Sequence, residues 1–355
     1  MNRTNGKVLR TLLVGLGRIG WQEHLPALLE TPGFRVTAAV DPAPERLAEC
    51  ENAFGIAGYP SLETALARER FDLAVIASPT CFHAEQTVAA LRGGCRVFCD
   101  KPAALDEAEF RRMASAAAST GRLLTVYQPL RVSRHQLYLK ELLRSGKLGA
   151  IFQLKLYRES WSCRDDWQAL RKNGGGMLLN YGSHLIDQAN DLLGGGGEVL
   201  GCTADRILSR GDADDVVKLL LRYGTVTVDI DIDQAAADRF CRIAVYGDRG
   251  SAVLPAAGDR WRLRLLKRSA AETAELHPGF AAPGRQYPAA ETEFEEETVT
   301  PPATPPPVRL YYENLYRAVT AGEALIDPLA ETGTLVRMID AARACARGNA
   351  ARNEA

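Results

Sequence analysis

The chain has 355 residues, of which 46% are hydrophobic and 25% are charged, and its formal net charge at pH 7 is −1. This length exceeds what one hydrophobic core usually holds, so we expect two domains. Lysines and arginines are spread along the chain without basic blocks, which argues against nucleic acid as a partner.

The N-terminal segment is predicted to form a buried strand. Its apolar stretch is only a few residues long and runs directly into Gly15, so it is too short for a membrane span or a signal peptide. The eight cysteines include no Cys-x-x-Cys pair, which favours reduced thiols and disfavours a metal site. We therefore expect a cytoplasmic protein without a membrane attachment.

Residues 1–127 alternate short apolar runs with longer helical patterns, which is typical of strands buried on both faces of a parallel sheet. The pattern predicts a doubly wound α/β domain. Pro26 should interrupt the first helix near His24, and Asp106 should cap a later one. The predicted strands are Leu12–Val14, Phe34–Val40, Leu73–Ala77, Arg96–Cys99 and Leu123–Tyr127.

Residues 128–355 are predicted to form an α+β domain for substrate binding and oligomerisation. Apolar and polar residues alternate over 152–157 and 226–233, which indicates a largely antiparallel or mixed sheet with one open face. The stretch 277–307 is predicted to be an extended loop or arm. A closing helix is expected from Tyr311, and the C-terminal helix is a candidate to pack back on the first domain.

A glycine fingerprint follows the first predicted strand and opens a helix. The turn, the close approach of a pyrophosphate and the helix packing each require a glycine, and the helix N-terminus favours the phosphates. Asp41 ends the second strand, where its carboxylate would bind the adenosine ribose and repel a 2′-phosphate. We therefore expect NAD rather than NADP, although Arg46 could offset the repulsion. The fingerprint residues are Gly15, Gly17, Arg18, Ile19 and Gly20.

Further cofactor candidates follow the later strands, because loops at the carboxyl ends of parallel strands line the ligand crevice. A purely local hydrogen bond is an equally good interpretation of His83, and a turn with an exposed lysine is an alternative for Lys101. These candidates are Ser78, Pro79, Thr80, His83, Asp100, Lys101 and Gln128.

The segment Gly174–Asp187 combines a triple glycine with a polar helical face. Asn180, His184 and Asp187 recur at helical spacing, and the glycines would let the helix approach a ligand closely. The alternative is a solvated polar face with an incidental histidine.

The fingerprint with His24, the Asp100-Lys101-Pro102 sequence and the segment Gly174–Asp187 together resemble the Gfo/Idh/MocA oxidoreductase family. The resemblance covers nearly the whole chain. It implies a Rossmann domain followed by a domain with a large open sheet, and reversible hydride transfer on sugars, polyols, inositols or related carbonyl compounds. It also implies a homodimer or homotetramer built through that sheet.

The resemblance further implies that Lys101 and His184 are the central catalytic pair. Asp100 replaces the glutamate that usually precedes this lysine, and Asn180 stands where many members carry aspartate. Because Asn180 cannot take up a proton, we expect Lys101 to be the leading acid/base. His184 would then be its partner, with Asn180 and Asp187 as orienting groups.

The sequence predicts the substrate-binding residues less precisely than the cofactor-binding residues. Aromatic and arginine side chains after residue 156 would suit a sugar or an anionic group, yet each could also be structural. The candidates are Arg158, Trp161 and Trp167, with Lys101, Asn180 and His184, and nearby Tyr157, Arg164 and Asp165.

Three functions remain open from the sequence. A sugar dehydrogenase or reductase is favoured because Lys101 and His184 are both present. An NAD-dependent glycosidase using transient oxidation would share the fold and cofactor. A non-catalytic dinucleotide-binding regulator would need neither side chain.

Overall fold

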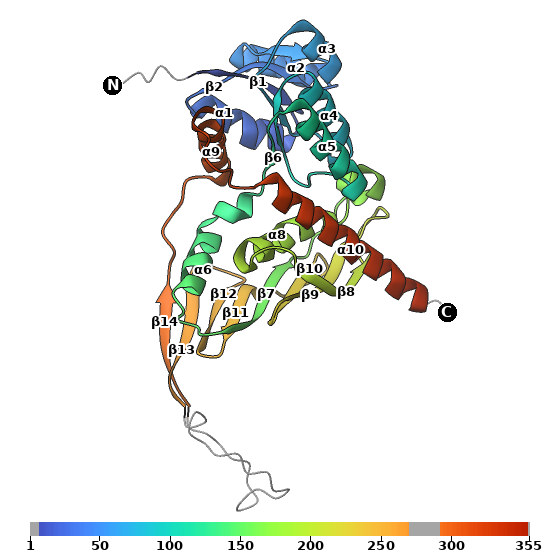
Figure 1. Cartoon of the computed structure of the whole chain (residues 1–355). Helices are drawn as coiled ribbons and strands as arrows, with labels where there is room; N and C mark the ends of the chain where they lie inside the picture. Colours follow the sequence, from blue (N-terminus) through green and yellow to red (C-terminus); the bar gives the residue numbers. More distant parts are fainter. Residues whose placement is uncertain (1–6, 270–291, 354–355) are drawn as a thin grey trace, which may run out of the picture.

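The computed structural model describes residues 7–269 and 292–353 and contains two sheets, one in each half of the molecule (Figure 1). The first sheet has six parallel strands in the order β3-β2-β1-β4-β5-β6, which confirms the doubly wound domain. Strand β3 was not predicted, because three residues are too few to show a period. The strands are β1 (Leu9–Val14), β2 (Phe34–Val40), β3 (Ala57–Tyr59), β4 (Leu73–Ile76), β5 (Arg96–Cys99) and β6 (Leu124–Val126).

Helices cover both faces of this sheet. Buried side chains of α3, α4 and α5 pack on one face, and those of α1, α2 and α9 pack on the other. Helix α9 lies beside α1 although the two are far apart in the sequence (Figure 1). The helices are α1 (Leu25–Glu30), α2 (Pro44–Phe54), α3 (Leu62–Arg68), α4 (His83–Arg92), α5 (Glu107–Thr120) and α9 (Pro307–Ala321).

Local sequence signals explain two helix boundaries. The first helix is divided into a π-helical turn, η1 (Gly20–His24), and α1, with Pro26 in the first turn of α1, where its missing N–H costs little. The Asp106 side chain accepts a hydrogen bond from the Glu109 backbone N–H at 2.8 Å. The predicted interruption and N-cap are both confirmed.

The second sheet has eight strands in the order β14-β13-β12-β11-β7-β10-β9-β8. Only the β7 and β10 pair is parallel within the described sheet, so the prediction of a mostly antiparallel sheet is confirmed. The strands are β7 (Ile151–Glu159), β8 (Glu198–Asp205), β9 (Val216–Tyr223), β10 (Val226–Asp233), β11 (Cys241–Gly247), β12 (Gly250–Pro255), β13 (Trp261–Ser269) and β14 (Thr292–Val299).

Helices α6, α8 and α10 lie on one face of this sheet (Figure 1). Val228, Ile230 and Ile232 of β10 point into that core, while Asp229 and Asp231 alternate with them on the other face. No helix of the described residues covers this second face. The helices are α6 (Arg134–Arg144), α7 (Met177–Asn180), α8 (Gly182–Leu193) and α10 (Leu329–Asn353), with 3₁₀ turns η2 (Thr80–Phe82), η3 (Pro129–Val132), η4 (Trp167–Ala169) and η5 (Arg171–Asn173).

Two predictions about the C-terminal part need correction. Residues 292–299, predicted as loop, form β14, because they pair antiparallel with β13 over its whole length. The closing helix begins at Pro307 instead of Tyr311, since proline is well suited to a first turn. Residues 300–306 are in neither a helix nor a strand, as predicted, and the part of the predicted loop from 277 to 291 lies outside the described residues.

Helix α10 connects the two halves of the molecule. It contacts α5 and β6 of the first domain and α8 and β8 of the second (Figure 1). The Asp340 carboxylate accepts a hydrogen bond from the Glu107 backbone N–H at 2.8 Å, which fixes α10 to the start of α5. The C-terminal helix therefore contacts both sheets.

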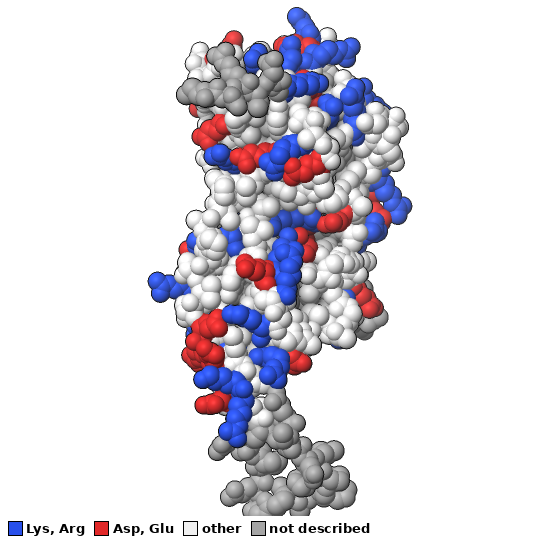
Figure 2. All heavy atoms as spheres, turned by 60° about the vertical axis from the view of Figure 1, so that its left-hand side comes forward, with Lys and Arg blue, Asp and Glu red and all other residues white. Residues whose placement is uncertain are grey.

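Charged side chains of both signs are interspersed over the face drawn in Figure 2, as they are along the sequence. Among the helices of the described residues, none combines the length and apolarity that a bilayer crossing requires.

Candidate active site

The predicted cofactor residues lie at one edge of the parallel sheet, where the carboxyl ends of the strands meet. They follow five different strands, so the fold brings together segments that are distant in the sequence. Gly15 follows β1, Asp41 follows β2, Ser78 follows β4, Asp100 and Lys101 follow β5, and Gln128 follows β6.

The glycine loop has the geometry that a pyrophosphate requires. Gly15 has φ +98°, and a Cβ atom there would lie 2.8 Å from the Ala77 backbone. A Cβ at Gly20 would lie 1.9 Å from the Gly15 carbonyl oxygen, whereas nothing lies within 4 Å of a Cβ at Gly17. The first and third glycines are therefore required for packing, and Gly17 leaves open space beside the backbone. Arg18 and Ile19 are helical and lead directly into η1.

Asp41 is held against the glycine loop. It is 3% exposed and accepts hydrogen bonds from the Leu16 N–H at 2.8 Å and the Ala43 N–H at 3.0 Å. Arg46 Nη1 lies 3.4 Å from the same carboxylate and offsets part of its charge. A carboxylate has about four acceptor positions, so Asp41 retains capacity for a ribose hydroxyl.

The loop after β4 is fixed by His83. Its Nδ1 lies 2.8 Å from the Pro102 carbonyl oxygen and its Nε2 lies 2.7 Å from the Ser78 carbonyl oxygen. A neutral imidazole has one N–H, so it donates to one of these carbonyls and only lies close to the other. Both neighbours are backbone groups, which supports the local interpretation of this histidine. Pro79 and Thr80 lie between the residues that it joins.

Gln128 is a buried amide with unsatisfied ends. The side chain is 1% exposed, and neither Nε2 nor Oε1 has a hydrogen-bond partner among the residues described. Its backbone carbonyl accepts from the Tyr311 hydroxyl at 2.8 Å, which fixes the residue in place. Because an unpaired buried amide costs about 1–3 kcal/mol, the group is suited to a polar partner from outside the chain.

Lys101 joins the two domains at this edge. Its Nζ donates to Asn180 at the end of α7, to Oδ1 at 2.9 Å and to the backbone oxygen at 3.2 Å. Burial lowers the pKa of Lys101 to about 8; Asp100 opposes this shift, and Arg18 and Arg164 add to it. The amine can therefore gain or lose a proton near neutral pH. The Lys101–Pro102 peptide bond is cis.

Gln168 in η4 orients the Asn180 amide. The Asn180 Nδ2 donates to the Gln168 Oε1 at 3.2 Å, so the Asn180 Oδ1 is left to face Lys101. The sequence analysis missed Gln168, because no spacing connects it to Asn180.

The helix predicted over this segment is divided at Tyr181, between α7 and α8.

His184 lies in the first turn of α8. Its Nδ1 is buried and has no hydrogen-bond partner within the described part of the chain. Burial, together with the charges of Lys101 and Arg158, holds the pKa of His184 well below its usual value. The imidazole is consequently neutral at pH 7.

Asp187 is placed in a buried ion-pair cluster. Arg131 of η3 donates to its carboxylate from Nη2 at 2.6 Å and from Nε at 2.9 Å. Arg131 also lies 3.2 Å from Asp327 and 2.6 Å from Glu331. Asp187 is not a hydrogen-bond partner of Lys101, Asn180 or His184 in the described structure, so it positions α8 instead of touching the other site residues.

The predicted substrate residues come from the end of β7 and from the segment that follows it, up to η4. Arg158 is the penultimate residue of β7. Its guanidinium lies 4.8 Å from the centre of the Tyr181 ring and donates to the Tyr181 hydroxyl at 3.1 Å. Arg164 is paired with Asp166. Trp161 is 66% exposed and follows β7, and Trp167 is half-buried in η4. Tyr181 was missed as a site residue although it lies in the predicted motif.

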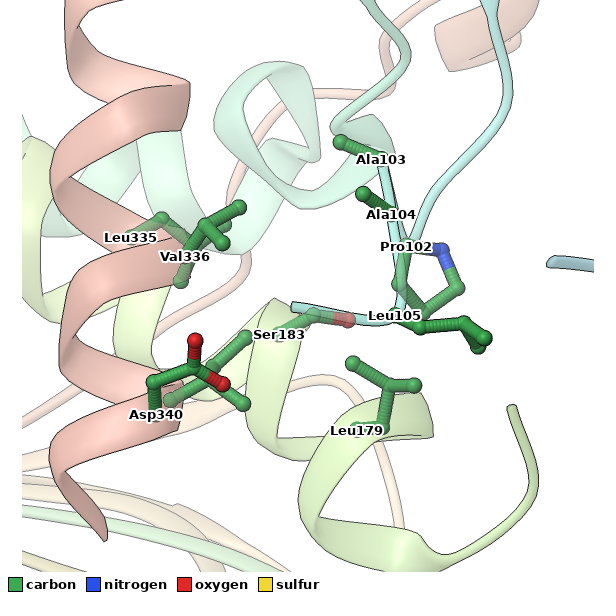
Figure 3. A pocket seen from close by; sticks show the side chains of 10 residues that line it. Pro102, Ala103, Ala104, Leu105, Leu179, Ser183, Leu335, Val336 and Asp340 are labelled. Carbon is green, nitrogen blue, oxygen red and sulfur yellow. The ribbon is translucent and has the colours of Figure 1, made fainter. Parts of the chain in front are cut away.

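A small pocket lies between Pro102–Leu105 and α10 (Figure 3). Its walls are mainly apolar and do not include Lys101, Asn180 or His184, so it belongs to the domain contact. It is lined by Pro102, Ala103, Ala104, Leu105, Leu179, Ser183, Leu335, Val336, Ile339 and Asp340. Within the described residues, no group of three or more histidine, cysteine, aspartate or glutamate side chains could hold a metal ion.

Relatives of the chain are named as oxidoreductases. It is 28% identical over 255 residues to an uncharacterized oxidoreductase of Schizosaccharomyces pombe, with 68% of this chain and 69% of the relative covered. It is 27% identical over 281 residues to D-apiose dehydrogenase of Paraburkholderia graminis, with 78% and 74% covered. It shares its fold with the WlbA dehydrogenase of Bordetella pertussis, solved in complex with NADH and UDP-GlcNAcA, at a TM-score of 0.79, 21% identity and 98% coverage of each chain.

Two family models match the chain, one in each half. Residues 9–128 match the oxidoreductase family with an NAD-binding Rossmann fold, and residues 137–253 match the C-terminal domain of the same family. The two matches cover the whole first sheet, strands β7 to β11 of the second sheet and the segments that carry Lys101 and His184. The chain therefore belongs to the Gfo/Idh/MocA family of oxidoreductases.

Proposed function

We propose that the protein is an NAD-dependent dehydrogenase or reductase that transfers hydride to or from a CH–OH carbon of a sugar, polyol, inositol or related carbonyl compound. The observation that carries the proposal is Lys101 at the carboxyl end of β5. Its Nζ is held by Asn180, and its pKa is about 8. The D-apiose dehydrogenase relative supports a sugar-like substrate.

The residues at the sheet edge fit a dinucleotide. Gly15, Gly17 and Gly20 would admit the pyrophosphate, and Asp41 would accept from the adenosine ribose. Gln128 would pair with a polar group of the bound cofactor, because both ends of its amide lack partners in the described structure. The remaining cofactor contacts that we propose come from Arg18, Ile19, Arg46, Ser78, Pro79, Thr80 and Asp100. His83 would contribute by holding the loop that carries Ser78, Pro79 and Thr80.

NAD is proposed over NADP on the position of Asp41. Its carboxylate would repel a 2′-phosphate, and Arg46 offsets only part of this charge because its side chain is half exposed and its Nη1 lies 3.4 Å away.

The bound cofactor supplies the hydride acceptor or donor. In the oxidation direction, the neutral Lys101 amine takes the proton of the substrate hydroxyl, and in the reduction direction the ammonium returns it. Neutral His184 binds the same substrate oxygen and stabilises the carbonyl group that forms there. Asn180 orients Lys101, and Asp187 fixes α8 through Arg131.

The chain is proposed to divide at residue 127 into the cofactor domain and the domain for substrate binding and oligomerisation. A homodimer or homotetramer would form through the open face of the second sheet, where Leu220 is 40% exposed. Light scattering of the purified protein at micromolar concentration checks this, and a monomer would contradict it.

The hydride-transfer proposal is tested by an absorbance screen for NADH. The purified protein is incubated with NAD or NADP and with sugars, inositols, sugar acids and nucleotide sugars. Stoichiometric NADH production that Lys101→Met abolishes would support it, and Lys147→Met is the matched control because Lys147 is half exposed in a weak surface pair. Sugar bond cleavage without net NADH would indicate a glycosidase instead. Binding of NADH with no turnover of any substrate would indicate a regulator.

A further inference from the structure

Arg158 is a cation without a counter-charge beside the catalytic pair. No carboxylate of the described residues forms an ion pair with it, and its one hydrogen bond there is to the Tyr181 hydroxyl at 3.1 Å. A guanidinium carries five N–H donors, so four remain for a ligand. The neighbouring Arg164 differs in this respect, since it is paired with Asp166.

The strand register directs Arg158 toward the site. Arg158 pairs with Ile232 of β10, and Leu156 pairs with Ile230, so Arg158 lies on the sheet face that packs against α8. Unlike Leu156, Arg158 is exposed, because it is at the end of the strand. The alternation therefore brings the guanidinium to the end of the covered face.

Tyr181 connects Arg158 to the reacting groups. It directly follows Asn180, which binds Lys101, and its ring centre lies 6.1 Å from that of His184. The guanidinium lies over the ring at 4.8 Å, a cation–π contact that restricts its position. Tyr181 thus contacts the Arg158 guanidinium, lies beside the His184 ring and directly follows the residue that binds Lys101.

Acidic neighbours do not neutralise Arg158. The Glu159 carboxylate accepts from the Phe240 backbone N–H at 2.9 Å, and the Asp166 carboxylate is bound by Arg164. The negative charge of Asp100 offsets part of the positive charge of Lys101. The charges that act on His184 are those of Lys101 and Arg158, and both are positive. A site with excess positive charge attracts anions.

We propose that the substrate is an anionic sugar derivative whose carboxylate or phosphate group is bound by Arg158. A planar guanidinium forms paired hydrogen bonds with either group, and its cation–π contact with Tyr181 orients it beforehand. This proposal rests on the proposed function for the position of the reacting carbon, which Lys101 and His184 would bind while Arg158 holds the anion.

Binding is measured on the full chain saturated with NADH, by thermal shift and calorimetry. The probes are D-glucuronate and D-galacturonate, glucose 6-phosphate, and the neutral D-glucose, D-galactose and myo-inositol. We expect at least one anionic probe to bind about tenfold or more tightly than its neutral counterpart, since a charged hydrogen-bonded pair contributes about 1.5–3 kcal/mol. Preference for the uronates identifies a carboxylate, and preference for glucose 6-phosphate identifies a phosphate.

Arg158→Gln should remove this preference, and Arg158→Lys should retain part of it. Arg92→Gln is the matched control, because Arg92 ends α4, whose other end faces the site. Equal binding of anionic and neutral probes, or a preference that survives in Arg158→Gln, would overturn the proposal. So would a lack of binding by every anionic probe.

The two proposals fail in different ways. Anion binding that depends on Arg158 without NADH production from any probe contradicts the proposed function alone. Turnover of a neutral sugar that Arg158→Gln leaves unchanged contradicts the anionic substrate alone.

Discussion

The Nζ atom of Lys101 lies 2.9 Å from the Oδ1 atom of Asn180, which connects the end of β5 in the first domain to α7 in the second. The acceptor is a neutral amide, so it holds the lysine in place without adding a negative charge that would favour the ammonium. Gln168 fixes which end of the amide faces Lys101. The proton affinity of Lys101 therefore depends on both domains.

Replacing Lys101 by methionine should lower kcat by about 10²–10⁴-fold, because the proton acceptor of the reaction is lost. The dissociation constant of NADH should remain nearly unchanged, and NADH fluorescence titration measures it. His184→Ala should cost less in kcat and more in KM. Near wild-type turnover of the Lys101→Met variant would show that Lys101 is not the acid/base, and the role would then be assigned to His184.

The rate should depend on pH through Lys101, whose pKa in the folded protein is about 8 compared with an ordinary value of 10.5. Oxidation needs the neutral amine, so kcat/KM for oxidation should rise as the pH passes through about 8 and then level off. Reduction needs the ammonium, so it should decline over the same range. Initial rates in both directions from pH 6 to 10 provide the check, and a flat profile contradicts it.

Asn180→Asp should shift the oxidation profile to higher pH by about one unit or more, because a carboxylate close to Lys101 favours its charged form. Asn180→Ala is the control without added charge, and it should not produce an alkaline shift. If the aspartate variant keeps the wild-type profile, Lys101 is not the titrating group.

Asp41→Ser should weaken NAD binding about tenfold to a hundredfold and reduce discrimination against NADP, because a charged hydrogen-bond acceptor contributes about 1.5–3 kcal/mol. Asp41→Asn keeps an oxygen acceptor for the Leu16 N–H while it removes the charge. It therefore separates the effect of the lost charge on NAD binding from the effect of the lost hydrogen bond to the loop. Calorimetric titrations with both cofactors measure these effects. Tenfold tighter binding of NADPH than NADH by the wild type would disprove the assignment.

Arg131→Met should lower the free energy of unfolding by about 3–5 kcal/mol, since it leaves the buried Asp187 and Asp327 without their cation. Urea unfolding followed by circular dichroism measures the change. Arg111→Met is the control: its pair with Glu107 is on the surface of α5 and contributes about 0.5 kcal/mol or less. Equal effects of the two variants would show that the buried cluster is not a stability element.

The sequence by itself determined the elements whose signals are local. Continuous apolar runs identified the strands β1, β2, β4, β5 and β6 because a strand buried on both faces has no polar alternation. The glycine spacing from Gly15 to Gly20 was equally informative, since backbone geometry restricts those positions to glycine.

The tertiary structure alone decided which side chains meet. Helical spacing grouped Asp187 with His184, but Asp187 pairs with Arg131. A buried carboxylate is costly unless a cation lies beside it, and Arg131 is that cation. Asn180 faces Lys101 through an amide that Gln168 orients, and Arg158 reaches Tyr181 because two strands pair in one register. Each contact joins segments that are distant in the chain, and periodicity within one segment carries no information about the segment that packs against it.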